Sequence, residues 1–137
     1  MIIGLDHIAI AVPDLSKSIK RFTKDFGLAC AGREDVVNAQ TSTAFFHQPS
    51  AKIELVHPLE GQGPIAKYLQ NHGGGLHHLC FRSDNLEEDV ACLRGMGYQF
   101  LSDQPQPGAH GCRVIFIHPK SCDGVLIELS QRADHHD

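Results

Sequence analysis

The chain has 137 residues, the length of one domain, and 42% of them are hydrophobic, which is enough for a packed core. Its formal net charge of −4, with no basic run, argues against binding to nucleic acid or to an anionic membrane. No apolar stretch reaches the roughly 18 residues that a membrane span needs. We also expect no secretory signal, because the N-terminus lacks a charged region followed by an apolar one.

The first half of the chain predicts a β-α-β-β-β module over residues 3–57. Residues 3–12 alternate as a strand does, and Asp14 is placed to cap the following helix. Apolar residues then recur at helical spacing. Gly27, which follows the last of them, is suited to a helix C-terminus. The apolar residues are Leu15, Ile19, Phe22 and Phe26. Three strands are predicted next, near residues 28–37, 41–47 and 51–57.

The second half predicts another module of the same kind over residues 75–130. A linker at 58–74 contains a short helix with Pro64 in its first turn. Asn85 and Glu88 resemble a capping box for the main helix of this half. Strands are predicted near 98–102, 112–118 and 124–130, with a loop at 105–111. We expect the tail from Gln131 to be polar and frayed, and its His135 and His136 to be solvated.

The two halves repeat each other, and this repeat predicts the architecture. GLDHIAI at 4–10 corresponds to GLHHLCF at 75–81, and IEL at 53–55 corresponds to IEL at 127–129. We therefore predict an α+β fold in which two paired βαβββ modules form one cupped mixed sheet within a single domain, 1–137.

Each copy carries one histidine in its opening strand and one glutamate in its closing strand. Strand alternation separates His7, Glu54, His78 and Glu128 from the apolar faces of their strands. Any one of them alone would more simply be a buried or surface residue, but four repeat-matched positions favour a metal site. Two imidazoles and two carboxylates suit Co²⁺, Ni²⁺, Mn²⁺, Fe²⁺ or Zn²⁺. Such a site on a six-coordinate ion leaves two positions for water or substrate.

The cysteines predict a cytoplasmic protein with reduced thiols. Their number is odd and no CxxC pair is present. They are Cys30, Cys80, Cys92, Cys112 and Cys122. We interpret Cys80, beside the second histidine, as a small core residue.

Several motifs resemble the vicinal oxygen chelate superfamily, and within it most closely the methylmalonyl-CoA epimerases. They are DHIAIAVPDL at 6–15, KIELVHPL at 52–59, PIAKYLQNHGGGLHH at 64–78, GAHG at 108–111, HPKS at 118–121 and GVLIEL at 124–129. The resemblance implies a homodimer that binds an acyl-CoA substrate. It also implies one divalent ion per chain, often cobalt, held by His7, Glu54, His78 and Glu128. Glu128 would also act as a base while the C2 epimers of methylmalonyl-CoA interconvert through an enolate.

The chain departs from this family at one position. Some members carry a second glutamate base where this sequence has Thr43, and no carboxylate lies between Val36 and Ile53. His47, a water molecule or Glu54 could supply the second proton. Alternative functions are a glyoxalase-type isomerase similar to lactoylglutathione lyase, an extradiol dioxygenase, or a non-catalytic protein that binds small molecules.

Overall fold

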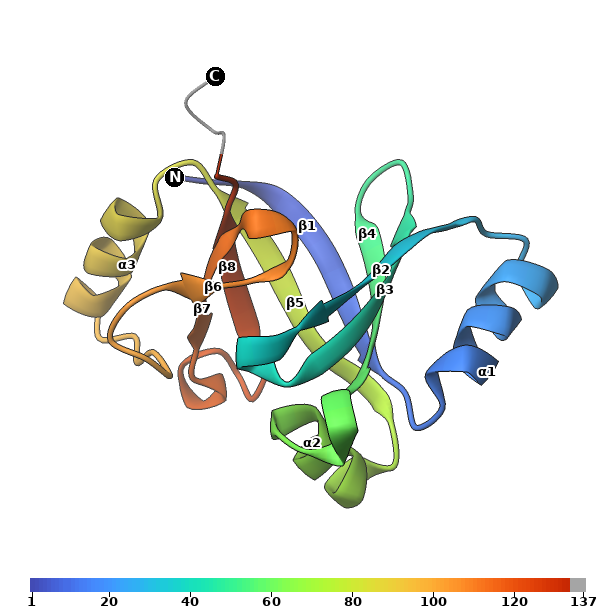
Figure 1. The fold of residues 1–137 in the computed structure, drawn as a ribbon. Helices are drawn as coiled ribbons and strands as arrows, with labels where there is room; N and C mark the ends of the chain where they lie inside the picture. Colours follow the sequence, from blue (N-terminus) through green and yellow to red (C-terminus); the bar gives the residue numbers. More distant parts are fainter. Residues whose placement is uncertain (134–137) are drawn as a thin grey trace. The chain divides into compact units, whose positions relative to one another are not determined.

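A computed structural model of the protein describes residues 1–133; His135 and His136 lie outside this range. Its strands and α-helices, shown in Figure 1, are β1 (Ile2–Ala11), α1 (Leu15–Lys20), β2 (Cys30–Val36), β3 (Thr41–His47), β4 (Lys52–Pro58), α2 (Pro64–His72), β5 (Gly75–Ser83), α3 (Leu86–Gly95), β6 (Gln106–Pro107), β7 (Arg113–Ile117) and β8 (Ile127–Gln131). A π-helical turn lies at Arg21–Asp25, and 3₁₀ turns lie at Val37–Ala39, Leu59–Gly61, Ala109–Gly111 and Pro119–Ser121. Within residues 1–133, no helix is both long and apolar enough to cross a membrane.

The chain divides into two compact units. One consists of His7–His77, and the other of Met1–Asp6 with the residues from His78 onward. Strands β1 and β5 each contribute residues to both units, and the division falls at the two histidines that the repeat singled out. The unit His7–His77 thus includes the predicted linker 58–74 and residues 75–77 of the predicted second module, whereas residues 3–6 of the predicted first module belong to the other unit.

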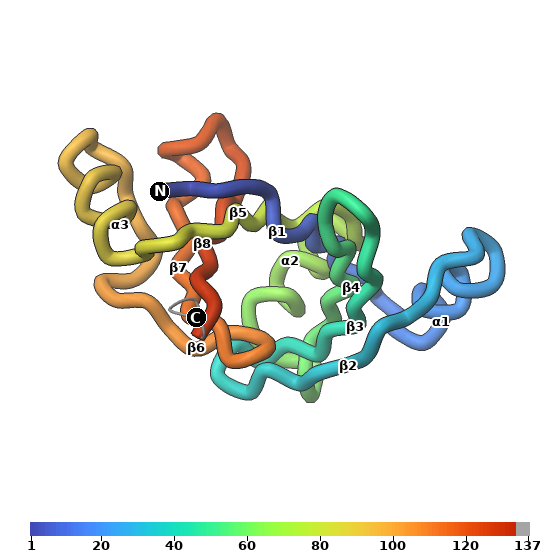
Figure 2. Tube along the Cα trace, turned by 90° about the horizontal axis from the view of Figure 1, so that it is seen from above, coloured from blue at the N-terminus to red at the C-terminus, as the bar shows by residue number. Residues whose placement is uncertain are grey.

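The unit His7–His77 has the strand order β2-β3-β4-β1, in which β1 and β4 are parallel and the other pairs are antiparallel. The trace in Figure 2 shows β2, β3 and β4 side by side. Helix α1 begins after Asp14, whose carboxylate accepts the N–H of Lys17 at 3.0 Å. Leu15 of this helix packs on Ala44, Phe46 and Leu55 on one face of the sheet. The other face is left for polar residues and for α2.

The second unit repeats this connectivity in the order β5-β8-β7-β6, with β5 and β8 parallel. The Asn85 side chain accepts the N–H of Glu88 at 3.2 Å, as the predicted cap requires. The buried core on the α3 face consists of Leu86, Val90, Ile115, Ile117 and Leu129. Each unit thus has the predicted βαβββ connectivity, and the α+β class is confirmed.

Several predicted elements differ from the structure. The loop predicted at 105–111 contains the two-residue strand β6, which pairs with β7. The helix predicted up to Phe26 ends as α-helix at Lys20, because the Thr23 hydroxyl donates to Ile19 O at 2.9 Å and the backbone widens into a π turn. Phe26 is consequently exposed. The strand predicted at 98–102 is reduced to a single bridge between Phe100 and Ile117.

The arginine of α3 accounts for the missing strand. Arg94 donates to the carbonyls of Ser102 and Asp103 at 2.9 and 3.0 Å, and its guanidinium lies over the Phe100 ring. Gln99 O still accepts the N–H of His118, and the Leu101 N–H donates to Phe116 O, but the chain after Leu101 is held against the helix. The predicted tail also begins later than expected, because Gln131 is the last residue of β8 and is buried.

Candidate functional site

In the unit His7–His77, the sheet face away from α1 carries a buried histidine–glutamate pair. His7 and Glu54 are 6% and 7% exposed, and His7 Nδ1 lies 3.2 Å from Glu54 Oε2. Strand pairing explains this contact, because Ala9 of β1 is the register partner of Glu54 and shares a face with His7. Ala9 is fully buried. Its small side chain is next to Glu54 across the strand pair and follows His7 by two residues in β1.

The second unit contains a corresponding pair. His78 Nε2 lies 3.0 Å from Glu128 Oε1, and the two residues are 9% and 7% exposed. Cys80 takes the place of Ala9: it is fully buried, follows His78 by two residues, and is the register partner of Glu128 in the parallel β5–β8 pair. Each half of the chain thus builds the same motif, a histidine and a glutamate on either side of a small residue.

Each glutamate also faces a phenylalanine across an antiparallel pair. Phe45 of β3 is opposite Glu54, and Phe116 of β7 is opposite Glu128. The Phe116 ring further meets the His78 imidazole edge-on. These two aromatic residues were not predicted from the sequence, although Phe45 and Phe116 occupy equivalent places in the repeat.

Burying these histidines and glutamates costs free energy unless their polar atoms have partners. An ionised carboxylate removed from water needs a charged or hydrogen-bonding partner, and a hydrophobic pair of similar volume would stabilise the unit at least as well. An imidazole N–H donated to the carboxylate satisfies such a pair, and so does a metal ion bound by both atoms. The donors are imidazole nitrogens and carboxylate oxygens, which suit a borderline divalent ion. The residues of each pair therefore fit the predicted metal chemistry.

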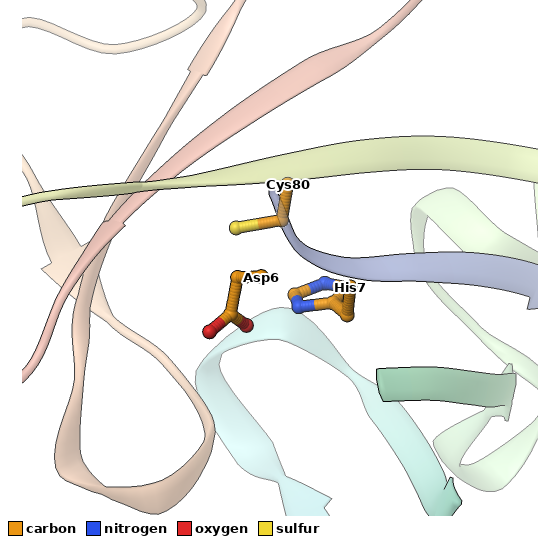
Figure 3. A group of neighbouring side chains, drawn as sticks. All are labelled: Asp6, His7 and Cys80. Carbon is orange, nitrogen blue, oxygen red and sulfur yellow. The ribbon is translucent and has the colours of Figure 1, made fainter. Parts of the chain in front are cut away.

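Cys80 has the packing role that the sequence predicted. Its Sγ lies 3.7 Å from Phe81 O and within 4.8 Å of an Asp6 carboxylate oxygen, and Figure 3 shows these two side chains on neighbouring strands. No cysteine of residues 1–133 forms a disulfide, and the four other than Cys80 are exposed or only partly buried.

Three further side chains named by the sequence have structural contacts. His77 packs edge-on against Tyr68. His57 is partly buried, and its Nδ1 lies 2.9 Å from Val12 O. Thr43 is 3% exposed in β3, so the position that is glutamate in some relatives is buried here.

The profile of the Glyoxalase/Bleomycin resistance protein/Dioxygenase superfamily matches residues 6–116. The chain belongs to this superfamily, and its relatives are concentrated in one enzyme group. It is 41% identical over 93% of its length to the mitochondrial methylmalonyl-CoA epimerase of Homo sapiens, of which it covers 73%. It is 38% identical over 96% of its length to the ethylmalonyl-CoA/methylmalonyl-CoA epimerase of Cereibacter sphaeroides, of which it covers 99%.

Solved structures agree with this grouping. The crystal structure of methylmalonyl-CoA epimerase from Mycobacterium tuberculosis has a TM-score of 0.91 and 34% identity, over 96% of this chain and 89% of that one. A methylmalonyl-CoA epimerase in complex with methylmalonyl-CoA and NH4+ has a TM-score of 0.91 and 28% identity, over 98% and 97%. The predicted glyoxalase-like fold and the predicted relationship to epimerases are both confirmed.

Proposed function

We propose that this protein is an isomerase that interconverts the two C2 epimers of methylmalonyl-CoA. The observation that carries the proposal is the pair of buried, repeat-equivalent His–Glu contacts, His7 with Glu54 and His78 with Glu128. A chain of the epimerase group that keeps four polar residues buried at matched positions has the side chains that proton transfer next to a thioester requires.

The same four residues are proposed to bind one divalent ion. Their nitrogen and oxygen donors suit Co²⁺, which the family resemblance favours, and also Ni²⁺, Mn²⁺ or Zn²⁺. When bound, such an ion acts as a Lewis acid that stabilises negative charge on the substrate's thioester oxygen. His7, Glu54 and His78 serve as ligands in this proposal, whereas Glu128 has a second role.

Glu128 is proposed to move the proton. C2 of the substrate lies between a thioester and a carboxylate, and its C–H bond becomes acidic only when the thioester oxygen takes up the electrons. The Glu128 carboxylate accepts the C2 proton, and the electron pair of the C–H bond passes to the thioester, which forms an enolate. A positioned general base of this kind contributes about 10²–10⁴-fold to the rate. Burial of Glu128 keeps this carboxylate away from competing water.

Solvent exchange at C2 tests the proposal. Racemic methylmalonyl-CoA in D₂O should lose its C2 proton signal by NMR when metal-loaded protein is added, and each pure epimer should yield the other. Ethylmalonyl-CoA, run in parallel, tests whether a substrate with a longer side chain at C2 is also accepted. If metal-loaded protein exchanges the C2 proton of neither compound, the epimerase function is wrong, and a thiol adduct of a 2-oxoaldehyde becomes the next substrate to test.

Two further expectations accompany this function. We propose a homodimer in the cytoplasm, on the basis of the family resemblance and the reduced cysteines. Sedimentation velocity at micromolar concentration should show a species of twice the chain mass. A single species of monomer mass at all concentrations would contradict the dimer without affecting the chemistry.

A further inference from the structure

An epimerisation needs a second proton donor, and this requirement rests on the function proposed above. The enolate is planar at C2, so a base that removes and returns the proton on one face regenerates the starting epimer. Inversion occurs only when another group delivers a proton to the opposite face. Glu128 can serve one face alone. We propose that Glu34 of β2 is the second acid–base catalytic residue.

The strand register puts Glu34 on the same sheet face as the His7–Glu54 pair. Glu34 is directly opposite Thr43 in the β2–β3 pair, and Thr43 is directly opposite Val56 in the β3–β4 pair. Residues directly opposite each other in antiparallel strands point to the same face, with Cβ atoms about 4.5–5.5 Å apart. Val56 follows Glu54 by two residues in β4, so the two also share a face. The Glu34 carboxylate therefore extends from the face that carries the proposed ligands.

No other carboxylate of the unit His7–His77 is similarly placed, apart from Glu54 itself. Asp14 caps α1, and Asp35 accepts a hydrogen bond from Ser42 on the opposite face of β2. Asp25 and Glu60 are exposed in helical turns outside the sheet. Glu34 is half-buried, which suits a group that must contact both a substrate and exchangeable solvent protons.

His47 is the competing candidate on this face. It lies two residues beyond Phe45 in β3, so it shares the face, but it is exposed at the end of the strand. Glu34 instead adjoins Thr43, which is 3% exposed. Next to Glu34 on the same face is Gly32, the register partner of Phe45, and no atom of residues 7–77 outside its chain neighbours lies within 4 Å of a Cβ built there. There is therefore open space at Gly32, two residues before Glu34 on the same face.

The proposed step balances in both directions. In one direction, ionised Glu128 accepts the C2 proton and protonated Glu34 donates its own proton to the opposite face of the enolate. The C–H bond on one face breaks, a C–H bond on the other face forms, and the electron pair returns from the thioester to carbon. Glu128 ends protonated and Glu34 ends ionised, which is the state that starts the reverse reaction. Exchange of both protons with solvent resets the enzyme.

Single-epimer exchange in D₂O tests this assignment with Glu34→Gln, which preserves size but removes the exchangeable acid. The variant should lose inversion by about 10²-fold or more. It should still exchange the C2 proton of one epimer without inverting it, because Glu128 continues to remove and return a proton on its own face. The other epimer should be inert. Asp35→Asn is the matched control, since it changes the adjacent carboxylate on the opposite face, and it should leave both rates unchanged.

Three outcomes would overturn the proposal. Inversion at the parental rate in Glu34→Gln would remove Glu34 from the chemistry. Equal loss of inversion and of exchange from both epimers, in a folded and metal-loaded variant, would assign it a positioning role. One-sided exchange in His47→Asn with normal inversion in Glu34→Gln would identify His47 as the donor. If the parental protein itself exchanges neither epimer, it is the epimerase function that fails, and this result is distinguishable from the other three.

Discussion

The ring of Phe116 meets the imidazole of His78 edge-on, with centroids 5.3 Å apart and planes at 90°. Phe116 is also directly opposite Glu128 across the β7–β8 pair. One aromatic side chain therefore contacts the histidine of a His–Glu pair and is the cross-strand neighbour of its glutamate. An edge-on ring contact of this kind restricts the rotation of the His78 imidazole. A ligand oriented in advance loses less entropy when it binds a metal.

Replacing this ring should therefore weaken metal binding more than folding. Phe116→Leu is expected to lower metal affinity by about 10-fold, the lower end of the effect of removing groups that orient ligands. The free energy of unfolding should fall by about 1 kcal/mol, since an aromatic contact is lost but the site stays apolar. Titration with Co²⁺ and urea unfolding of the metal-free protein measure the two effects separately.

Phe100→Leu is the matched control for Phe116→Leu. Phe100 packs in the core of the same unit on the α3 side, away from the His–Glu pair. Its replacement should lower stability by a similar amount and leave metal affinity unchanged. Equal metal affinity in Phe116→Leu and in the parental protein would show that the ring does not orient His78.

The positions of the four predicted ligands follow from the sequence because strand alternation and an internal repeat are local signals. A period of two places His7 and Glu54 on polar faces whatever the rest of the chain does. The partners of these residues are not local. Whether Phe116 is opposite Glu128 depends on the register of a hairpin, which is determined by turn geometry as well as by the hydrophobic pattern.

Gln131 illustrates the same limit for the fold. From the sequence it begins a polar tail, but its Oε1 accepts the N–H of Leu86 at 2.7 Å and its Nε2 donates to Asp84 O at 3.2 Å. A contact across 45 residues of chain has no periodicity that could reveal it. The helix predicted up to Phe26 was wrong for a local reason. Thr23 fits a helical pattern, but its hydroxyl donates a hydrogen bond to the backbone carbonyl of Ile19.

Gln131→Leu should therefore destabilise the protein. The substitution leaves two backbone groups at the start of α3 without their partner, in a place that is buried. The expected loss is about 2 kcal/mol in the free energy of unfolding, measured by urea denaturation. Gln104→Leu changes an exposed glutamine and should stay within about 0.5 kcal/mol of the parent. If both variants unfold at the same urea concentration, the glutamine does not cap the helix.

Removal of either histidine should abolish stoichiometric metal binding. His7→Ala and His78→Ala each delete one nitrogen donor and leave a buried glutamate without its imidazole partner. The parental protein should bind about one divalent ion per chain, and each variant should fall well below that value. The measurement is metal content after dialysis, made in a background with His135→Ala and His136→Ala, because the tail could bind metal independently.

His72→Ala is the control for these variants, since His72 is exposed at the end of α2. It should retain the parental metal content. Full occupancy in both His7→Ala and His78→Ala would contradict the proposed ligand set.

The two glutamates should separate metal binding from proton transfer, because only Glu128 is assigned both roles. Glutamine at either position keeps an oxygen ligand but is a far poorer base. Glu54→Gln should therefore retain metal and measurable turnover. Glu128→Gln should retain partial metal occupancy but lose solvent exchange at C2 by about 10²-fold or more, the usual contribution of a positioned general base. Deuterium uptake into methylmalonyl-CoA and metal content are measured on the same samples, so that lost metal is not mistaken for lost base. Parental exchange by metal-loaded Glu128→Gln would make Glu128 a ligand only, and the C2 proton would then have to leave through another group of the site.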